Sequence, residues 1–317
     1  MNRKKLNRVA IVGIGGIGGY FGTKLLNRYA ADKKIEIIFV QRGKHLRKIQ
    51  ANGLTYQTKN HEYTVVPDLA IDKPDKAGIF DLVLFCVKSP DLEQSALMIK
   101  KNLTRNSIVI STLNGMDMGK RLRAVLSVPR VLPGCIYISA QIEKPGIVRQ
   151  AGGVGPFFFG PENNDFRNLL GVGSFLKNAG IKAVLEENIR YRLWEKYLFV
   201  CPFASLTSLN DQTIGQIIGN KMSKNLLFGL IDEIRKIARQ EGVVFSDQII
   251  RSIIERAELI PAETTTSMQV DFRSGKKGEI DVFTGYVVRK GKALGIPVPL
   301  HEKIYRELLT KIQKKNE

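Results

Sequence analysis

The sequence has few cysteines and no long apolar run. Its three cysteines, Cys86, Cys135 and Cys201, are too few for a disulfide framework, and their wide spacing fits no zinc-ligand pattern. No run of about 18 apolar residues occurs, so no membrane-spanning helix is predicted. Glycines interrupt the first apolar stretch, which is not typical of a secretion signal. We therefore expect a protein of a reducing compartment, the cytoplasm, with no metal site and no membrane partner.

Acidic residues are scarce relative to basic ones. The chain has 49 Lys and Arg residues against 30 Asp and Glu residues, which gives a formal net charge of +19. Residues 1–186 contribute 28 − 14 = +14 of this charge. No basic run of five residues, helix-turn-helix spacing or RNP-like aromatic strand accompanies the excess. A solvated basic surface that attracts anionic ligands is therefore favoured over specific nucleic-acid binding.

Apolar segments of strand type alternate with helical segments in the first part of the chain. Strands are expected at residues 8–12, 35–40, 81–87 and 107–113. Continuous apolar strands alternating with helices indicate a parallel sheet that is covered on both faces. Residues 131–160 contain short strand-like pieces separated by glycine and proline, which we interpret as added antiparallel strands.

The pattern becomes helical from residue 187 onward. Helices are expected at residues 188–209, 221–241, 247–257, 279–294 and 299–315. Few segments in this part have strand character. We therefore predict an α/β domain over residues 1–187, followed by an all-helical domain over residues 188–317.

A glycine-rich turn directly follows the first expected strand and opens a helix. It matches G-x-G-x-x-G, with a predicted dinucleotide contact at each of Gly13, Gly15, Gly16, Ile17 and Gly18. Gly13 allows the tight turn, Gly15 lets a pyrophosphate approach the backbone, and Gly18 lets the helix pack closely on the sheet. Free N–H groups at the helix start then face the anion. The motif predicts a Rossmann-type domain, and a purely structural glycine turn is the alternative.

The end of the second expected strand indicates which dinucleotide binds. An NAD enzyme places a carboxylate there to accept hydrogen bonds from the ribose 2′-hydroxyl. Residues 39–44 contain no carboxylate, whereas Arg42 can pair with a 2′-phosphate, supported by Lys44. The sequence therefore favours NADP(H) over NAD(H), and an ordinary exposed arginine is the alternative for Arg42.

Two further loops follow sheet strands at their carboxyl ends, where ligands of such folds gather. Lys88 lies in the first of these loops and is a candidate contact to phosphate or ribose. Asn114 lies in the second loop, and its amide can form a hydrogen bond to the nicotinamide side or to the substrate.

With these residues collected, the chain resembles the ketopantoate reductases (2-dehydropantoate 2-reductases) nearly from end to end. The matching segments are residues 13–18, 87–88, 113–116, 193–196, 267–271, 278–281, 284–286 and 293–299. The resemblance implies a Rossmann domain followed by an all-helical domain, NADPH as the hydride donor, and an active site in the cleft between the domains. It also implies a 2-oxo acid as the small-molecule partner, most simply 2-dehydropantoate of pantothenate biosynthesis. A homodimer stays open.

The resemblance also implies roles for residues of the second domain. Lys196 matches the catalytic lysine of the family, whose ammonium stabilises the charge on the ketone oxygen and donates the proton. Glu279 matches the active-site glutamate, and Ser267 matches the serine that binds the substrate carboxylate. The alternatives are a surface lysine, a helix-surface carboxylate and a helix cap, respectively.

The chain departs from the family pattern at three positions. Ketopantoate reductases carry asparagines where this chain has Val200, Ala204 and Ile214. Residues 196, 200 and 204 share one face of a helix, so the face expected to bind the substrate is largely apolar. A polar substrate would lose hydrogen bonds there, which favours a less polar 2-oxo acid as the alternative substrate.

Two other classes of protein stay open. One is a related Rossmann-plus-helical dehydrogenase that oxidises a hydroxy acid or joins an amino acid to a keto acid. The other is a non-catalytic NADPH-binding protein. The presence of both Lys196 and Glu279 favours a reductase, because a pure sensor needs neither side chain.

Overall fold

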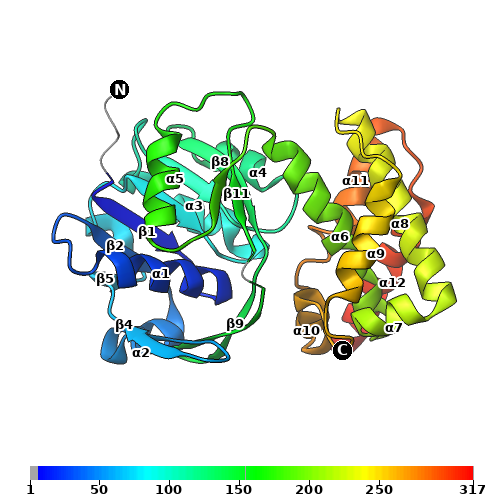
Figure 1. The fold of residues 1–317 in the computed structure, drawn as a ribbon, viewed down its shortest axis with the longest axis horizontal. Coiled ribbons are helices and arrows are strands. Elements are labelled where there is room, and N and C mark those ends of the chain that lie inside the picture. Colours follow the sequence, from blue (N-terminus) through cyan, green and yellow to red (C-terminus); the bar gives the residue numbers. More distant parts are fainter. Residues whose placement is uncertain (1–5, 154, 317) are drawn as a thin grey trace. The chain divides into compact units, whose positions relative to one another are not determined.

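The computed structural model describes residues 6–153 and 155–316, and Figure 1 shows its fold. The chain packs as two compact units, unit 1 (Met1–Ile189) and unit 2 (Arg190–Glu317). Unit 1 combines strands with helices, whereas residues 190–316 contain helices and no strand. The predicted order of an α/β domain and an all-helical domain is therefore confirmed. The sequence places the division two residues earlier, after residue 187.

An eight-stranded sheet forms the centre of unit 1. Its strands are β1 (Arg8–Val12), β2 (Glu36–Val40), β5 (Leu69–Ile71), β6 (Leu82–Phe85), β7 (Ile108–Ser111), β8 (Arg130–Ile136), β11 (Phe157–Phe159) and β12 (Ala183–Leu185). They lie in the order β12-β11-β8-β7-β6-β1-β2-β5. Neighbours from β8 to β5 pair in parallel, and β11 pairs antiparallel with β8. The chain reverses its direction across the sheet between β1 and β6, which is where ligands of such sheets bind.

Helices cover both faces of this sheet (Figure 1). Their bounds are α1 (Gly16–Tyr29), α2 (Gly43–Asn52), α3 (Leu92–Ile99), α4 (Met118–Val125) and α5 (Leu169–Asn178), with short 3₁₀ turns at η1 (Pro74–Lys76), η2 (Ser89–Asp91) and η3 (Lys100–Asn102). The rings of Tyr29 and Phe175 stack with centroids 4.3 Å apart, which joins α1 to α5. Connections β1-α1-β2 and β6-α3-β7 run in opposite directions, so right-handed crossovers put α1 and α3 on opposite faces.

Unit 1 contains a second sheet that the sequence did not predict. Its strands are β3 (Leu54–Gln57), β4 (Glu62–Val65), β9 (Ser139–Lys144) and β10 (Ile147–Gly152), in the order β4-β3-β10-β9. The interpretation of residues 131–160 as added antiparallel strands is therefore only partly right. β11 and the β9–β10 hairpin are antiparallel, but β8 extends the main sheet in parallel and β10 pairs in parallel with β3.

Helix α1 packs against both sheets, and glycines make this possible. A Cβ atom on Gly22 would lie 2.5 Å from the ring of Phe39 in β2. A Cβ atom on Gly16 would lie 1.8 Å from the carbonyl oxygen of Ala140 in β9. Because glycine has no Cβ, the helix can approach β2 on one side and β9 on the other. Helix α1 therefore contacts the second sheet at its first residue, Gly16, and the main sheet further along, at Gly22.

Seven helices build unit 2 in the described part of the chain. The first of them begins at Ile189, the last residue of unit 1. They are α6 (Ile189–Asn210), α7 (Ile214–Gly219), α8 (Lys221–Gln240), α9 (Gln248–Glu258), α10 (Ser267–Arg273), α11 (Thr284–Leu294) and α12 (Pro299–Asn316). The five helices expected from the sequence are present, and the short α7 and α10 are additional. One expected boundary is wrong, because α11 begins at Thr284 and Glu279 lies in the turn before it.

A buried hydrogen bond between Glu233 and His301 joins α8 to the start of α12. The Glu233 carboxylate accepts hydrogen bonds from the backbone N–H groups of Leu300 (2.8 Å) and His301 (3.1 Å), and it lies 2.7 Å from Nδ1 of His301. His301 is fully buried, and burial lowers the pKa of its imidazole despite the neighbouring carboxylate. A neutral ring that donates from Nδ1 leaves Nε2 facing Sγ of Cys201 on α6, at 3.9 Å.

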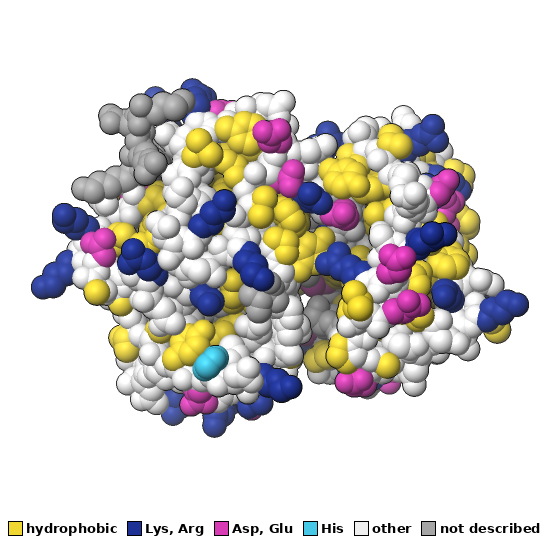
Figure 2. Space-filling view, viewed as in Figure 1, with side chains coloured by type: hydrophobic (Ala, Val, Ile, Leu, Met, Phe, Trp, Pro, Cys, Tyr) yellow, Lys and Arg dark blue, Asp and Glu magenta, His cyan; other side chains and the backbone are white. Residues whose placement is uncertain are grey.

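Basic side chains are spread over the surface. On the face shown in Figure 2 the Lys and Arg side chains stand singly or in small groups. Several are ion-paired, including Arg8 with Glu36 and Arg123 with Glu162. None of the helices in the described part of the chain combines the length and the apolar character that crossing a membrane requires.

Candidate active site

The glycine-rich turn of unit 1 has the backbone geometry of an anion site. Gly13 follows β1 with a φ of +91°, and its N–H donates to the carbonyl oxygen of Val40 at 2.9 Å. Gly15 is the N-cap of α1 and provides no side-chain hydrogen bond to the helix start. A Cβ atom on Gly15 would meet nothing within 4 Å, so open space lies beside the first turn of α1. Helix N–H groups without a side-chain cap and room for a group beside them fit a pyrophosphate.

Three loops meet at this turn. The backbone N–H of Ile14 donates to Oε1 of Gln41, 2.9 Å away in the loop after β2. A Cβ atom on Gly13 would lie 2.8 Å from the backbone nitrogen of Val87 in the loop after β6. A Cβ atom on Gly18 would lie 1.9 Å from the carbonyl oxygen of Gly13, so a side chain there would break the turn. The carboxyl ends of β1, β2 and β6 therefore form one edge around the glycines.

Arg42 lies at this edge and is not unpartnered. It is the N-cap residue of α2, and its side chain is exposed. The Arg42 guanidinium forms an ion pair with the carboxylate of Asp91 at 2.6 Å. Asp91 ends η2 in the loop after β6 and is not among the site residues predicted from the sequence. Only its position three residues after Lys88 in a ligand-facing loop could have drawn attention to it.

The other two candidates of unit 1 lie in loops at the same edge. Lys88 precedes η2 and is exposed. Asn114 is half-buried in the loop between β7 and α4, followed by Gly115 with a φ of +110°. The structure therefore brings both residues to the carboxyl ends of β6 and β7, the side of the sheet that carries the glycine turn.

Unit 2 holds the candidate catalytic pair. Lys196 lies on α6 with 9% of its surface exposed, so the alternative of a surface lysine is wrong. Glu279 is 8% exposed in the turn before α11, so the alternative of a helix-surface carboxylate is also wrong. Neither side chain is without a partner in the structure. Lysine and glutamate are rarely buried unless they serve as paired or functional charges.

A tyrosine on α6 binds the segment that carries Glu279. The buried hydroxyl of Tyr197 lies 3.0 Å from the carbonyl oxygen of Val282 and 2.7 Å from that of Phe283. In the same turn, the backbone N–H groups of Val282 and Phe283 donate to the carbonyl oxygen of Glu279. The residue next to Lys196 therefore holds the Glu279 turn against α6.

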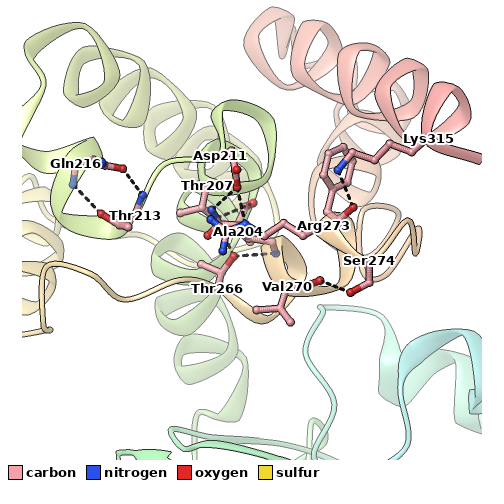
Figure 3. A network of polar contacts seen from close by, with 12 residues as sticks. Ala204, Thr207, Asp211, Thr213, Gln216, Thr266, Val270, Arg273, Ser274 and Lys315 are labelled. Carbon is pink, nitrogen blue, oxygen red and sulfur yellow. Dashed lines mark hydrogen bonds and ion pairs between the residues drawn. The ribbon is translucent and has the colours of Figure 1, made fainter.

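Ser267 is the first residue of α10 and is exposed. The cap of this helix is Thr266, whose Oγ1 accepts from the N–H of Gln269 at 3.2 Å, so the alternative of Ser267 as a cap is wrong. Oγ1 of Thr266 lies 2.7 Å from Oγ1 of Thr207 on α6 (Figure 3). This contact fixes the start of α10, and with it Ser267, to α6.

Asp211 strengthens the same contact between the end of α6 and α10. Its Oδ1 accepts from Nε2 of Gln269 at 3.0 Å. The same oxygen accepts from Nε of Arg273 at 2.7 Å (Figure 3). The hydrogen bonds from Gln269 and then Arg273 hold the pKa of the Asp211 carboxyl below its usual range. The network therefore ties the first turn and the last residue of α10 to Asp211, which directly follows α6.

The three departures from the family pattern are apolar and largely buried. Ala204 is 1% exposed, Ile214 is 4% exposed and Val200 is half-buried. Nearby polar groups do not all compensate: Ser205 is bonded to the carbonyl oxygen of Cys201 and to Thr284. Among the described residues near the end of α6, Oγ of Ser208 and Oε1 of Gln269 are buried without a hydrogen-bond partner.

Comparisons with protein families cover most of the chain. A model described as "Ketopantoate reductase PanE/ApbA" matches residues 9–164, and one described as "Ketopantoate reductase PanE/ApbA C terminal" matches residues 188–312. The chain belongs to this family of oxidoreductases. The resemblance to the ketopantoate reductases is thereby confirmed, and one match lies in each of the two parts of the chain.

Individual relatives are similar over nearly their whole length. The chain is 26% identical to "Uncharacterized oxidoreductase YkpB" of Bacillus subtilis over 302 residues, 94% of this chain and 96% of that protein. It is 26% identical over 312 residues to a "2-dehydropantoate 2-reductase" of Mesorhizobium japonicum, 92% of this chain and 94% of that protein.

Solved structures share the fold. A PanE/ApbA family ketopantoate reductase from Ralstonia eutropha superimposes with a TM-score of 0.88 at 29% identity, over 98% of this chain and 100% of that one. D-mandelate dehydrogenase with NADH and anilino(oxo)acetate also gives a TM-score of 0.88, over 98% of this chain and 100% of that one. At 20% identity the second likeness concerns the fold alone.

Proposed function

We propose that this protein is an NADPH-dependent reductase that converts a 2-oxo acid to a 2-hydroxy acid. The observation that carries the proposal is Lys196, a lysine buried on α6 in a chain whose two parts both match the ketopantoate reductase family. In its support, the glycine turn of unit 1 offers uncapped helix N–H groups to a pyrophosphate. A bound nicotinamide cofactor supplies the hydride for the reduction.

The choice of NADPH rests on the charges around the end of β2. Residues 39–44 contain no carboxylate that would accept hydrogen bonds from a ribose 2′-hydroxyl. Arg42, Lys44 and Lys88 are exposed cations near the same edge of the sheet, and Arg42 has the planar donor geometry that suits a phosphate. The phosphates would be held by Gly13, Gly15, Gly16, Ile17 and Gly18.

The residues of unit 2 account for the chemistry at the substrate. During reduction negative charge develops on the ketone oxygen, and the Lys196 ammonium at hydrogen-bond distance would stabilise it and donate the proton. Glu279 would help to orient the lysine and the substrate. Ser267 would bind the substrate carboxylate from the start of α10, and Asn114 of unit 1 would bind the substrate or the nicotinamide side.

The substrate is proposed at two levels. Ketopantoate (2-dehydropantoate) is the first candidate, because the family and the Mesorhizobium relative carry that name, and this reaction belongs to pantothenate biosynthesis. A less polar 2-oxo acid is the second candidate. Val200, Ala204 and Ile214 favour it, since an apolar helix face cannot form hydrogen bonds to a substrate hydroxyl.

Steady-state kinetics would test this function. Oxidation of NADPH is followed with purified protein and a panel of 2-oxo acids, from ketopantoate to branched acids without a hydroxyl group. Lys196→Ala should lower kcat at least 100-fold, whereas Lys221→Ala, an exposed lysine at the start of α8, should leave kcat unchanged. Turnover that survives Lys196→Ala would overturn the assigned role, and dinucleotide binding without any turnover would indicate a non-catalytic protein.

A single substitution would test the apolar face. Val200 is half-buried, so Val200→Asn restores an amide with little added volume. The ratio of kcat/KM for ketopantoate to kcat/KM for an acid without the hydroxyl should rise about tenfold. This is the usual contribution of one hydrogen bond to a substrate. Val184→Asn, on β12 of unit 1, is the matched control and should leave the ratio unchanged.

A further inference from the structure

The ion pair between Arg42 and Asp91 joins the two loops that flank the glycine turn. Arg42 is the N-cap residue of α2 after β2, and Asp91 ends η2 after β6. In the sheet, β2 and β6 are the two neighbours of β1. The pair therefore lies on the edge where the adenosine end of a dinucleotide binds in a Rossmann-type domain. The cation expected to bind a 2′-phosphate already has an anionic partner.

The carboxylate is held in place by a well-braced turn. The N–H of Asp91 donates to the carbonyl oxygen of Lys88 at 2.9 Å, which closes η2. From α4, Arg121 donates to the carbonyl oxygen of Ser89 at 2.9 Å and to both carboxylate oxygens of Glu93. Asp91 is therefore presented by a segment that is fastened to α4, and it does not depend on Arg42 for its position.

The contact itself is of the kind that a ligand can displace. One nitrogen of Arg42 contacts one oxygen of Asp91, and the side chains are 68% and 40% exposed. Exposed ion pairs of this kind contribute little free energy, and salt screens them. A doubly charged phosphate can therefore take over the guanidinium. The carboxylate stays close by, however, and repels the phosphate.

We propose that Asp91 is a specificity-determining residue that limits the preference for NADPH by competing with the 2′-phosphate for Arg42. This inference rests on the proposed dinucleotide function. A 2′-hydroxyl carries no charge, so NADH leaves the ion pair intact, and the carboxylate can accept a hydrogen bond from it. Arg42 favours NADPH and Asp91 favours NADH, so the balance between them sets how far the enzyme distinguishes the two cofactors.

Direct binding measurements test the proposal without requiring turnover. The dissociation constants of NADPH and NADH are measured by fluorescence titration for the wild-type protein and for Asp91→Asn. The substitution removes the charge and keeps the shape, so it should tighten NADPH binding about five- to tenfold and leave NADH binding unchanged or weaker. The gain should shrink at high ionic strength because the competing charges are screened.

Glu36→Gln is the matched control. Glu36 forms a half-buried ion pair with Arg8 at the opposite end of β2, so this variant gains the same net charge away from the edge that carries Arg42. It should leave both dissociation constants unchanged. An unchanged ratio of NADPH to NADH affinity in Asp91→Asn, or an equal shift in Glu36→Gln, would overturn the proposal.

A second variant tests the route through Arg42. In the Arg42→Ala background, Asp91→Asn should improve NADPH binding by less than it does in the wild type, because the cation for which the two anions compete is gone. A gain of full size in that background would overturn competition for Arg42. Failure of the reductase function would appear separately, as absence of turnover with any 2-oxo acid while the binding ratios stay measurable.

Discussion

The hydroxyl of Tyr197 lies 2.7 Å from the carbonyl oxygen of Phe283, although the two residues are 86 positions apart in the chain. Through this contact α6, which carries Lys196, holds the turn that carries Glu279. The buried side chains of Lys196 and Glu279 thus lie on two backbone segments that the hydroxyl of Tyr197 joins. We therefore expect Tyr197 to position these two segments relative to one another.

Tyr197→Phe should therefore separate positioning from folding. Removing the hydroxyl leaves two buried carbonyl groups without this donor, which should lower the free energy of unfolding by about 1 kcal/mol. If the Glu279 turn shifts, kcat should fall about tenfold while the dissociation constant of NADPH stays unchanged. Kinetics, fluorescence titration and urea denaturation measure the three quantities.

Tyr29→Phe is the control for Tyr197→Phe. Tyr29 is also buried, and its hydroxyl donates to the carbonyl oxygen of Phe175 at 2.8 Å in unit 1. The Tyr29→Phe variant should lose about as much stability as Tyr197→Phe, but its kcat should stay unchanged. Equal kcat values in the two variants would contradict a positioning role for Tyr197.

The glycine turn yields a prediction that distinguishes binding from packing. Gly15→Ala places a Cβ atom in open space at a backbone conformation that alanine tolerates, so stability should hardly change. That space is the proposed place of the pyrophosphate, so NADPH should bind at least tenfold more weakly.

Gly16→Ala, in contrast, should lower the stability of the protein. Its Cβ atom would lie 1.8 Å from the backbone oxygen of Ala140, so β9 or α1 must shift, at a cost of about 1–3 kcal/mol. Urea denaturation should rank Gly16→Ala well below Gly15→Ala in stability. Wild-type NADPH affinity in Gly15→Ala would contradict the phosphate assignment.

The parts of this molecule that the sequence predicts are those with local signals. The buried parallel strands are continuous apolar runs, and the glycine turn is a contiguous motif between a strand and a helix. The second sheet has no such signal, because β3 and β4 are four residues long and partly exposed. Its formation depends on glycines of α1 that allow β9 to approach, which is a tertiary effect.

The contacts that shape the candidate site could not be predicted from the sequence either, because they are also tertiary. Arg42 and Asp91 are 49 positions apart, and no local pattern links them. The apolar periodicity of the segment before α11 suggests a helix from residue 279, but the chain forms turns there, in which Gly278 adopts a φ of +54°. The burial of Glu279 follows from those turns and could not be read from helical spacing.

The cysteines should be unreactive while the protein is folded. Burial raises the pKa of the Cys86 and Cys201 thiols to about 12, and Cys135 is buried as well. At pH 8 only about one such thiol in ten thousand would be the reactive thiolate. A thiol reagent should therefore label the protein only in denaturant. Ser127→Cys, at an exposed position after α4, should add one rapidly labelled group, and rapid labelling of the wild type would contradict the prediction.

The buried His301 should make the stability of unit 2 depend on pH. Its pKa in the folded state is lowered by burial, so below about pH 6.5 the unfolded chain binds a proton that the folded chain resists. Stability should thus be constant with respect to this group above pH 6.5, and should fall by up to about 1.4 kcal/mol per pH unit below it. Trp194, the single tryptophan, lies on α6 and reports unfolding of this unit by its fluorescence.

His301→Gln identifies the source of that dependence. Glutamine keeps a donor for the Glu233 carboxylate but does not titrate, so the dependence of stability on pH below pH 6.5 should become shallower. His61→Gln, at an exposed position in unit 1, should leave the slope unchanged. If His301→Gln retained the wild-type slope in the Trp194 signal, the ring would already be protonated in the folded protein, with Glu233 as its counter-ion, and the direction assigned to its pKa would be wrong.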